Sequence, residues 1–269
     1  MDLHLKGEVA VVVGGARGIG RAIASAFVAE GADIAIIDRE PDSLDVAREL
    51  SGEEPARASA HVADVTDYQA IRLAAEQIRR DYGRCDHVVF AAGIGSGKFG
   101  FPFWNLDPGD WERVIRVNLI GAANVAHAFA PSMAEARSGT ILFIASVAGQ
   151  IGSQTDPPYS ASKAGLINFA QCAAKDLAPH GVRVNTLNPG MIKTALNRSV
   201  YQAWADRQPE SSQATYEEWA GEKVKAIVPL GRWQTAEDIA AMAVFLASPC
   251  AGNVTGQTIN VDGGYVMHW

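Results

Sequence analysis

Short apolar runs alternate with longer helical patterns along the chain, and this alternation constrains the fold more than any other feature of the sequence. It is typical of βαβ units around a parallel sheet. Most of the apolar runs are rich in Val and Ile without period-two alternation, as expected for strands buried on both faces. The sequence predicts seven strands, near Val9–Val13, Asp33–Ile37, Ala58–Val62, His87–Phe90, Thr140–Ala145, Arg183–Leu187 and Thr258–Val261.

Helical patterns fill the intervals between these strands. They lie near residues 18–30, 43–51, 67–82, 110–136, 159–179 and 235–247, and Asp67, Asp110 and Thr235 are candidate capping residues. The arrangement predicts an α/β Rossmann fold with a doubly wound, mostly parallel seven-stranded sheet and helices on both faces. No repeat or linker divides the 269 residues. We therefore expect a single dinucleotide-binding and catalytic domain over residues 1–269.

Charge and composition exclude several classes of partner. The formal charge of −7 and the scattered Lys and Arg residues argue against nucleic acid. No apolar run approaches the roughly 18 to 20 residues of a membrane span, and the amino terminus does not resemble a signal peptide. Cys85, Cys172 and Cys250 form an odd set without CxxC spacing, which indicates reduced thiols packed in the core. We expect a cytoplasmic protein without a membrane partner.

The first predicted strand runs directly into a glycine-rich turn, Gly14-Gly15-Ala16-Arg17-Gly18-Ile19-Gly20, and a helix follows. Glycines let a backbone turn sharply and approach a pyrophosphate, whose charge amide groups at the helix start can hold. The spacing is not that of G-x-G-x-x-G, so the strand before and the helix after carry the prediction. The alternative is a tight strand–helix turn that binds nothing.

Asp38 ends the second predicted strand, where a carboxylate can accept the ribose hydroxyls of adenosine and repel a 2′-phosphate. This favours NAD over NADP. NADP remains the alternative, because Arg17 and Arg39 could pair with that phosphate if the carboxylate turned away. Further along, Asp64-Val65 are candidates for adenine contacts, although an Asp there is as often a helix cap. Ala91-Ala92-Gly93 could let the nucleotide approach the backbone.

Tyr159 and Lys163 lie four residues apart at the start of a predicted helix, so their side chains share one face. A free tyrosine has a pKa near ~10, and a nearby ammonium would stabilise its phenolate and lower that pKa. Lys163 could also bind the nicotinamide ribose. Taken alone, the spacing favours an ordinary amphipathic helix with a surface lysine and a packed tyrosine over a catalytic pair.

With these residues in view, nearly the whole chain resembles the short-chain dehydrogenase/reductase family. Gly14–Gly20 resembles its TGxxxGxG turn, Tyr159–Lys163 its YxxxK motif, and Ser146 its catalytic serine thirteen residues earlier. Asn118 occupies the place of the family's proton-relay asparagine. The segment Asn188–Thr194 resembles the one that holds the nicotinamide carboxamide, which assigns Pro189, Gly190, Ile192 and Thr194 to the cofactor, and Val261–Gly264 resembles the family's C-terminal strand ending. Gly14 and Ala91 depart from the pattern, since the family usually has Thr and Asn there.

The resemblance implies a division of roles among these residues. Tyr159 would act as general acid or base, Ser146 would hold the substrate oxygen, Lys163 would tune the tyrosine, and Asn118 would position a water. The expected reaction is hydride transfer between NAD(H) and a secondary alcohol or ketone, with a polyol, sugar or other small hydroxy compound as substrate and no metal. The alternatives are an NADPH-dependent 3-oxoacyl carrier-protein reductase and a non-catalytic nucleotide-binding scaffold. Family members often form tetramers, so a homotetramer or homodimer through helices 110–136 and 159–179 is expected.

Residues 191–229 form a long connection between a strand and a helix, which predicts a substrate lid or an extra surface helix. Tyr216, Trp219, Ala220, Lys223, Val224 and Ile227 recur there at helical spacing. Tyr201, Trp204, Arg207 and Trp219 of this segment, with the loop Gly95–Trp104, could wall a pocket for a sugar face or an alicyclic ring. The same aromatics could equally be packing between lid and body.

Overall fold

The strands form one parallel sheet. The structure is a computed structural model that describes residues 1–51, 56–153, 155–193, 195–209 and 214–267. The seven strands are ordered β3-β2-β1-β4-β5-β6-β7, with bounds β1 Val9–Val13, β2 Asp33–Asp38, β3 Ala58–Val62, β4 His87–Phe90, β5 Gly139–Ile144, β6 Val182–Pro189 and β7 Thr258–Val261. The predicted Rossmann sheet is confirmed, and each strand lies within two residues of its predicted bounds.

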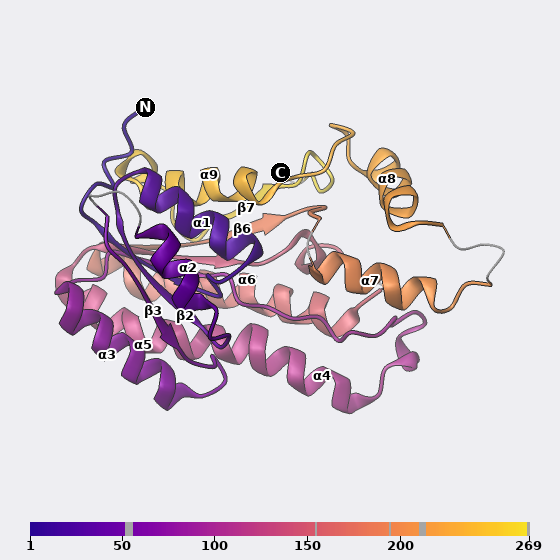
Figure 1. Ribbon diagram of the computed structural model, residues 1–269, viewed down its shortest axis with the longest axis horizontal. Coiled ribbons are helices and arrows are strands. Elements are labelled where there is room, and N and C mark those ends of the chain that lie inside the picture. Colours follow the sequence, from indigo (N-terminus) through magenta and orange to yellow (C-terminus); the bar gives the residue numbers. More distant parts are fainter. Residues whose placement is uncertain (52–55, 154, 194, 210–213, 268–269) are drawn as a thin grey trace.

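Helices cover both faces of this sheet (Figure 1). The helices are α1 Gly18–Ala29, α2 Ser43–Leu50, α3 Tyr68–Tyr82, α4 Pro108–Ile115, α5 Gly121–Ala136, α6 Pro157–Leu177, α7 Ala195–Ala205, α8 Tyr216–Ile227 and α9 Ala236–Ala247. Alternate side chains of one strand serve opposite faces. Ala10 and Val12 of β1 pack with α1 and α9, whereas Val11 and Val13 pack with α3, α5 and α6. The edge strands β3 and β7 are only half-buried, unlike the strands between them.

The predicted helix 110–136 is in fact two helices. A π-helical turn, Arg116–Ile120, separates α4 from α5. Such a turn inserts a residue into the helical hydrogen-bond register and often marks a functional site. Asp110 does not cap this helix from outside, because it lies in the first turn of α4 and its Oδ2 accepts a hydrogen bond from Asp107 N (2.9 Å).

The prediction of three core cysteines is wrong in two positions. Cys85 is half-buried, but Cys172 and Cys250 are exposed, and all three are free thiols. Cys172 lies on α6, which has its own solvent-facing side, so helical surroundings were a poor guide to burial. No helix in the described part of the chain combines the length and apolar composition needed to cross a membrane.

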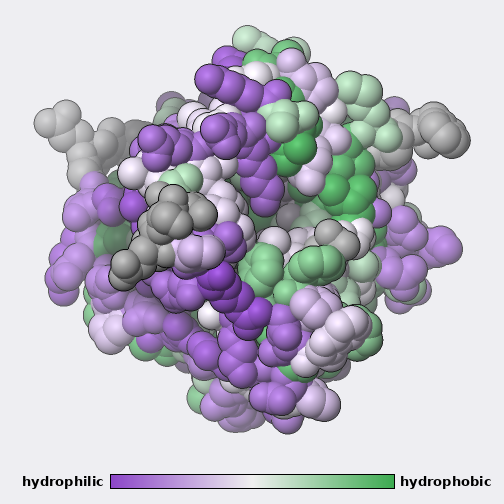
Figure 2. Space-filling model, turned by 90° about the vertical axis from the view of Figure 1, so that its right-hand side faces the viewer, coloured by the Kyte–Doolittle hydropathy of each residue, from purple (hydrophilic) through white to green (hydrophobic). Residues whose placement is uncertain are grey.

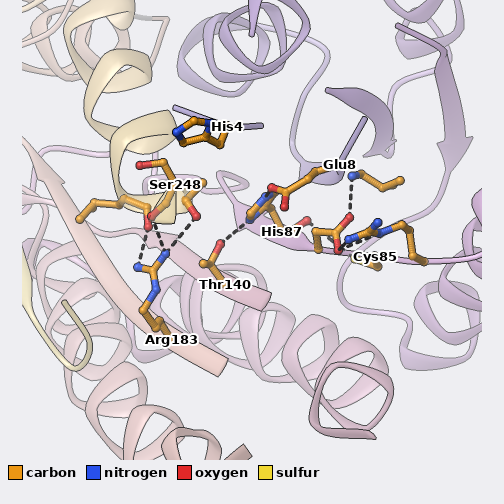
Figure 3. A network of polar contacts seen from close by, with 12 residues as sticks. His4, Glu8, Cys85, His87, Thr140, Arg183 and Ser248 are labelled. Carbon is orange, nitrogen blue, oxygen red and sulfur yellow. Dashed lines mark hydrogen bonds and ion pairs between the residues drawn. The ribbon is translucent and has the colours of Figure 1, made fainter. Parts of the chain in front are cut away.

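A polar network ties the amino ends of the strands together (Figure 3). The buried His87 of β4 bridges two elements: its Nε2 lies 2.6 Å from Glu8 Oε2, and its Nδ1 lies 2.8 Å from Thr140 Oγ1. On β6, Arg183 donates to the carbonyl of Leu246 (2.7 Å) and to that of Ser248 (3.0 Å). The strands are parallel, so this network lies at the edge opposite their carboxyl ends. It stabilises the fold at a distance from the carboxyl edge.

This network makes stability depend on pH. The hydrogen bond with His87 is the largest of the influences that together lower the pKa of Glu8. A lowered carboxylate pKa stabilises the folded state above the ordinary value of 4.5 and loses that effect as the pH falls through the folded-state pKa. We expect Glu8→Gln to reduce the free energy of unfolding by about 1 kcal/mol near neutral pH. The difference from wild type should shrink below about pH 4.5.

Urea unfolding at several pH values measures this effect. Glu135→Gln, an exposed change on α5, is the matched control and should shift stability by less than about 0.5 kcal/mol. If the loss in free energy of unfolding caused by Glu8→Gln stayed constant as the pH falls, it would contradict the role assigned to the Glu8–His87 hydrogen bond.

Candidate active site

A cavity of about 1310 Å³ opens at the carboxyl ends of the strands. Figure 2 shows this side of the molecule, where hydrophobic side chains gather around a hollow. Ligands of open α/β sheets bind at this edge, near the point where the strand order reverses. Here that point lies between β1 and β4. The cavity exceeds the usual range of roughly 300–1,000 Å³ for small-molecule sites, so it has room for a dinucleotide and a second small molecule.

The glycine-rich turn forms one end of the cavity. Gly14 and Gly18 have φ values of +81° and +56°, in the left-handed region that favours glycine. A Cβ on Gly14 would lie 2.7 Å from Ala92 N, so a glycine lets the turn rest against the loop after β4. The unusual Gly14 therefore fits a close backbone contact with the segment that contains Ala91. The N-cap residue of α1, Arg17, makes no side-chain capping hydrogen bond, so amide groups at the start of this helix can bind an anion.

Asp38 lies beside this turn at the end of β2. Its Oδ2 accepts a hydrogen bond from Ala16 N (3.0 Å) and its Oδ1 one from Glu40 N (3.1 Å). Both neighbouring arginines approach Glu40: Arg39 Nε lies 3.0 Å and Arg17 Nη2 lies 3.9 Å from Glu40 Oε1. Glu40, which was not predicted from the sequence, is therefore the carboxylate partner of both arginines.

Asp64 also lies on the cavity wall, and it shapes the loop after β3. Its Oδ1 accepts hydrogen bonds from Thr66 N and Thr66 Oγ1, both at 2.8 Å. The backbone hydrogen bond from Thr66 is the largest of the influences that together lower the pKa of Asp64. The alternative that Asp64 caps the next helix is wrong, because the cap of α3 is Asp67, which accepts from Ala70 N (3.1 Å).

Ser146, Tyr159 and Lys163 share the same cavity. Ser146 follows β5 in an extended conformation and accepts a hydrogen bond from Ala148 N (3.1 Å). Tyr159 lies in the first turn of α6, and Lys163 lies one turn further along. The Lys163 Nζ atom is 5.6 Å from the centre of the Tyr159 ring and donates to the carbonyl of Ile144 (2.8 Å). The predicted grouping of these three side chains is what the fold produces.

Burial dominates the ionisation of this pair. It raises the pKa of Tyr159 to about 12, while a hydrogen bond with Ser146 acts in the opposite direction. It lowers the pKa of Lys163 to about 8. Both shifts have one cause, since an apolar site disfavours the charged form of each group. The tuning of the tyrosine by Lys163 therefore stays a prediction.

Asp156 holds the start of α6 in place. Its Oδ1 accepts from Tyr159 N (3.4 Å) and its Oδ2 accepts from Ser96 N (2.8 Å), so one buried carboxylate joins the helix to the loop after β4. The sequence analysis missed Asp156. An Asp three residues before Tyr159 has the spacing of a helix cap, and that signal could have found it.

Asn118 lies in the π-helical turn and is fully buried. Its Nδ2 donates to the carbonyl of Ile94 and to Ser162 Oγ, both at 2.9 Å, and its Oδ1 accepts from Ile94 N (2.8 Å). The side chain thus fixes the loop that follows β4, and it is not among the residues that line the cavity. Its predicted role toward a relay water stays a prediction.

Most of the predicted cofactor residues line this cavity. They are Arg17, Gly18, Ile19, Gly20, Asp38, Arg39, Asp64, Val65, Ala91, Ala92, Gly93, Tyr159, Lys163, Pro189, Gly190 and Ile192. Gly15 is buried beneath the turn, where a Cβ would lie 3.1 Å from Ile36 Cγ2, and it does not line the cavity. Thr194 lies outside the described residues.

The predicted aromatic wall is wrong for most of its members. Phe103 and Trp104 are 65% and 71% exposed and lie off the cavity, which is lined by Gly95, Ser96 and Gly97 of the same loop. In the segment 191–229, the rings of Tyr201, Trp204 and Trp219 pack against one another with centroids 5.5–6.1 Å apart. These rings pack within the segment, whereas the second alternative was packing between the lid and the body. Residues that the sequence missed, including Met191, Val200, Trp233 and Tyr265, line the cavity instead.

A Rossmann sheet whose dinucleotide-binding edge also carries a Ser–Tyr–Lys group defines a class of protein, the nicotinamide-dependent oxidoreductases. Comparisons with known proteins agree. A family model described as enoyl-(acyl carrier protein) reductase matches residues 14–266. The chain belongs to the short-chain dehydrogenase/reductase family, whose members include enzymes that exchange hydride between a nicotinamide cofactor and a secondary alcohol or ketone.

Individual relatives differ in their substrates. The chain is 35% identical over 266 residues to a 3-oxoacyl-(acyl-carrier-protein) reductase from Thermotoga maritima, covering 98% of this chain and 100% of that protein. It is 33% identical over 267 residues to a D-threitol dehydrogenase from Mycolicibacterium smegmatis, covering 99% and 95%. It is 31% identical over 266 residues to an NAD-dependent glycerol dehydrogenase from Listeria innocua, covering 99% and 96%.

The glycine turn yields a direct prediction. A Cβ on Gly20 would lie 2.1 Å from the carbonyl oxygen of Gly14, and a backbone atom cannot yield as a flexible side chain can. We expect Gly20→Ala to weaken binding of the nicotinamide dinucleotide at least about tenfold and to lower the free energy of unfolding by about 1–3 kcal/mol. Calorimetric titration and urea unfolding measure the two effects. Gly109→Ala on α4 is the matched control, because nothing lies within 4 Å of its added Cβ. Wild-type binding by Gly20→Ala would contradict the role of this turn.

Proposed function

We propose that this chain is an NAD-dependent dehydrogenase that oxidises a secondary hydroxyl of a polyol, a sugar or another small hydroxy compound. The observation that carries the proposal is the position of Tyr159 and Ser146 on the wall of the cavity that Asp38 also lines. The D-threitol and glycerol dehydrogenases among the relatives support a polyol.

In this proposal Tyr159 exchanges a proton with the substrate oxygen, and Ser146 holds that oxygen by a hydrogen bond. Lys163 stabilises the phenolate of Tyr159 and binds the nicotinamide ribose. Asn118 fixes the segment at Ile94 and positions a relay water. The nicotinamide, when bound, accepts or gives the hydride at its C4 atom. The protein residues bind and orient the substrate and the cofactor, and they move the proton.

The dinucleotide would extend from the glycine turn to the segment after β6. Gly15, Gly18, Ile19 and Gly20 would shape the pyrophosphate site, Asp64 and Val65 would border the adenine, Ala91, Ala92 and Gly93 would lie under the nucleotide, and Pro189, Gly190, Ile192 and Thr194 would hold the nicotinamide. Asp38 would accept the adenosine ribose hydroxyls, which supports NAD, because its carboxylate would lie where NADP carries a phosphate. The engagement of Arg17 and Arg39 with Glu40 supports the same choice.

A second candidate is an NADPH-dependent 3-oxoacyl carrier-protein reductase. The Thermotoga maritima relative favours it, and Arg17 and Arg39 are the groups that would pair with a 2′-phosphate. Either enzyme would act as a single cytoplasmic domain with residues 191–229 as its lid, and as a homotetramer or homodimer through α4–α5 and α6. Light scattering of the purified protein measures the assembly.

Removing the tyrosine hydroxyl tests the proposed chemistry. We expect Tyr159→Phe to abolish alcohol oxidation, a loss of at least about 10²-fold in kcat, while NAD(H) binding stays within about twofold of wild type. Cofactor absorbance with a panel of alcohols and ketones measures the rate. Tyr68→Phe, a partly exposed tyrosine of α3 bonded to His127, should keep wild-type activity. Near wild-type turnover by Tyr159→Phe would overturn the assignment.

Exchanging the ribose-binding carboxylate tests the cofactor. Asp38→Ala removes the charge that would repel a 2′-phosphate, so we expect the ratio of kcat/KM for NAD to that for NADP to fall about tenfold or more. Asp42→Ala, exposed at the amino end of α2, is the control and should leave the ratio unchanged. A wild-type enzyme that already prefers NADP would favour the second candidate.

A further inference from the structure

The cavity wall carries an unusual cation. The basic residues that line the cavity are Arg17, Arg39, Arg113, Lys163, Lys193 and Lys223. Arg17 and Arg39 approach Glu40, Lys193 pairs with Glu217, and Lys163 belongs to the proposed catalytic group. Within the described part of the chain, no ion pair joins Arg113 or Lys223 to a carboxylate. These two cations therefore differ from the rest.

Burial separates Lys223 from Arg113. Arg113 is exposed, so water solvates its charge, whereas Lys223 is only partly exposed. The Nζ atom of Lys223 lies 5.0 Å from the centre of the Trp219 ring, one helical turn earlier on α8. Burial lowers the pKa of Lys223. An ammonium that has lost solvent and faces a cavity is stabilised when an anion binds there.

The scaffold around Lys223 holds it in place. Trp219 packs against the ring of Tyr201 at 5.5 Å and against that of Tyr216 at 6.4 Å. The next residue, Val224, is 2% exposed and packs with Met191 and Val228. These contacts fix the Trp219 ring and the turn of α8 that carries Lys223, so the lysine loses less freedom when its ammonium binds a ligand.

Lys223 lies on the segment that follows the proposed nicotinamide site. The dinucleotide phosphates are assigned to the glycine turn at the start of α1, where amide groups are available. The cavity wall also includes Asn197 and Val200 of α7, Ser153 and Tyr265, none of which has a part in the proposed dinucleotide site. An anion bound by Lys223 would therefore belong to the substrate.

We propose that Lys223 is a specificity-determining residue that binds a carboxylate on the substrate, so that the preferred substrate is a small hydroxy acid or its oxo acid. This inference rests on the proposed function and specifies its substrate class. The protein carries a formal charge of −7, which would repel an anion at long range. A single cation at the lid end of the cavity then decides between an acid and its neutral analogue.

Matched pairs of substrates test this proposal. The probes are 3-hydroxybutyrate, 4-hydroxypentanoate and gluconate, each beside its neutral amide, with NAD and with NADP. We expect wild type to prefer the acid of at least one pair by about 10- to 100-fold in kcat/KM, mostly through KM, since the amide keeps a hydrogen-bond acceptor but loses the ion pair between the carboxylate and the ammonium. Lys223→Met should remove this preference and leave turnover of the amide within about twofold of wild type.

Two variants control for folding and for charge. Lys225→Met, at an exposed lysine two residues further along α8, should keep the full preference for the acid. Lys223→Arg should retain part of it. Amide turnover by Lys223→Met shows that the variant is folded.

Three results would overturn the proposal: no pair in which the acid is preferred, an equal loss for acid and amide in Lys223→Met, or a change confined to the KM of the dinucleotide, which would assign Lys223 to the cofactor. In each of them turnover of neutral alcohols leaves the proposed function standing. Absence of turnover with every alcohol and ketone and with both cofactors would overturn the proposed function and this inference together.

Discussion

Parallel pairing of the strands is the constraint on which the rest of the structure depends. It places the carboxyl ends of all seven strands at one edge, and the order reverses between β1 and β4, so loops from both halves diverge around a gap. The glycine turn, Asp38, Ser146 and the segment after β6 reach the cavity because each follows a strand. The His87 network holds the opposite edge, so these stabilising contacts do not occupy the carboxyl edge where the cavity lies.

Supporting contacts around the reactive group explain its geometry. Asp156 ties the start of α6 to the loop at Ser96, and Asn118 ties the π-helical turn to Ile94. Both buried side chains hold the loop after β4 against the helix that carries Tyr159. Fixing side chains in this way lets a site hold its reactive groups in place before substrate arrives. The same burial raises the pKa of Tyr159 and lowers that of Lys163, because it disfavours the charged form of each group.

Local signals allowed the sequence to predict the sheet, because strand composition located the strands. The site residues Ser146, Tyr159 and Lys163 were predicted from the resemblance of their combined motifs to the family, since the spacing of Tyr159 and Lys163 alone indicated an ordinary helix. The failures depend on contacts between distant segments. The break at the π-helical turn has no local signature, and exposure of Cys172 depends on which side of α6 faces the core. The aromatic side chains of residues 191–229 pack together because α7 and α8 contact each other. Lys223 lies on the same helical stripe and therefore faces the cavity.

In the proposed reaction, this cavity brings a secondary alcohol and a nicotinamide together for direct hydride transfer. Incubation of the protein with an active alcohol deuterated at its carbinol carbon and with the oxidised cofactor measures this directly, by mass spectrometry of the reduced cofactor. We expect one deuterium on the nicotinamide ring in each turnover. Reduced cofactor without deuterium would show that the hydrogen comes from elsewhere and would contradict direct hydride transfer.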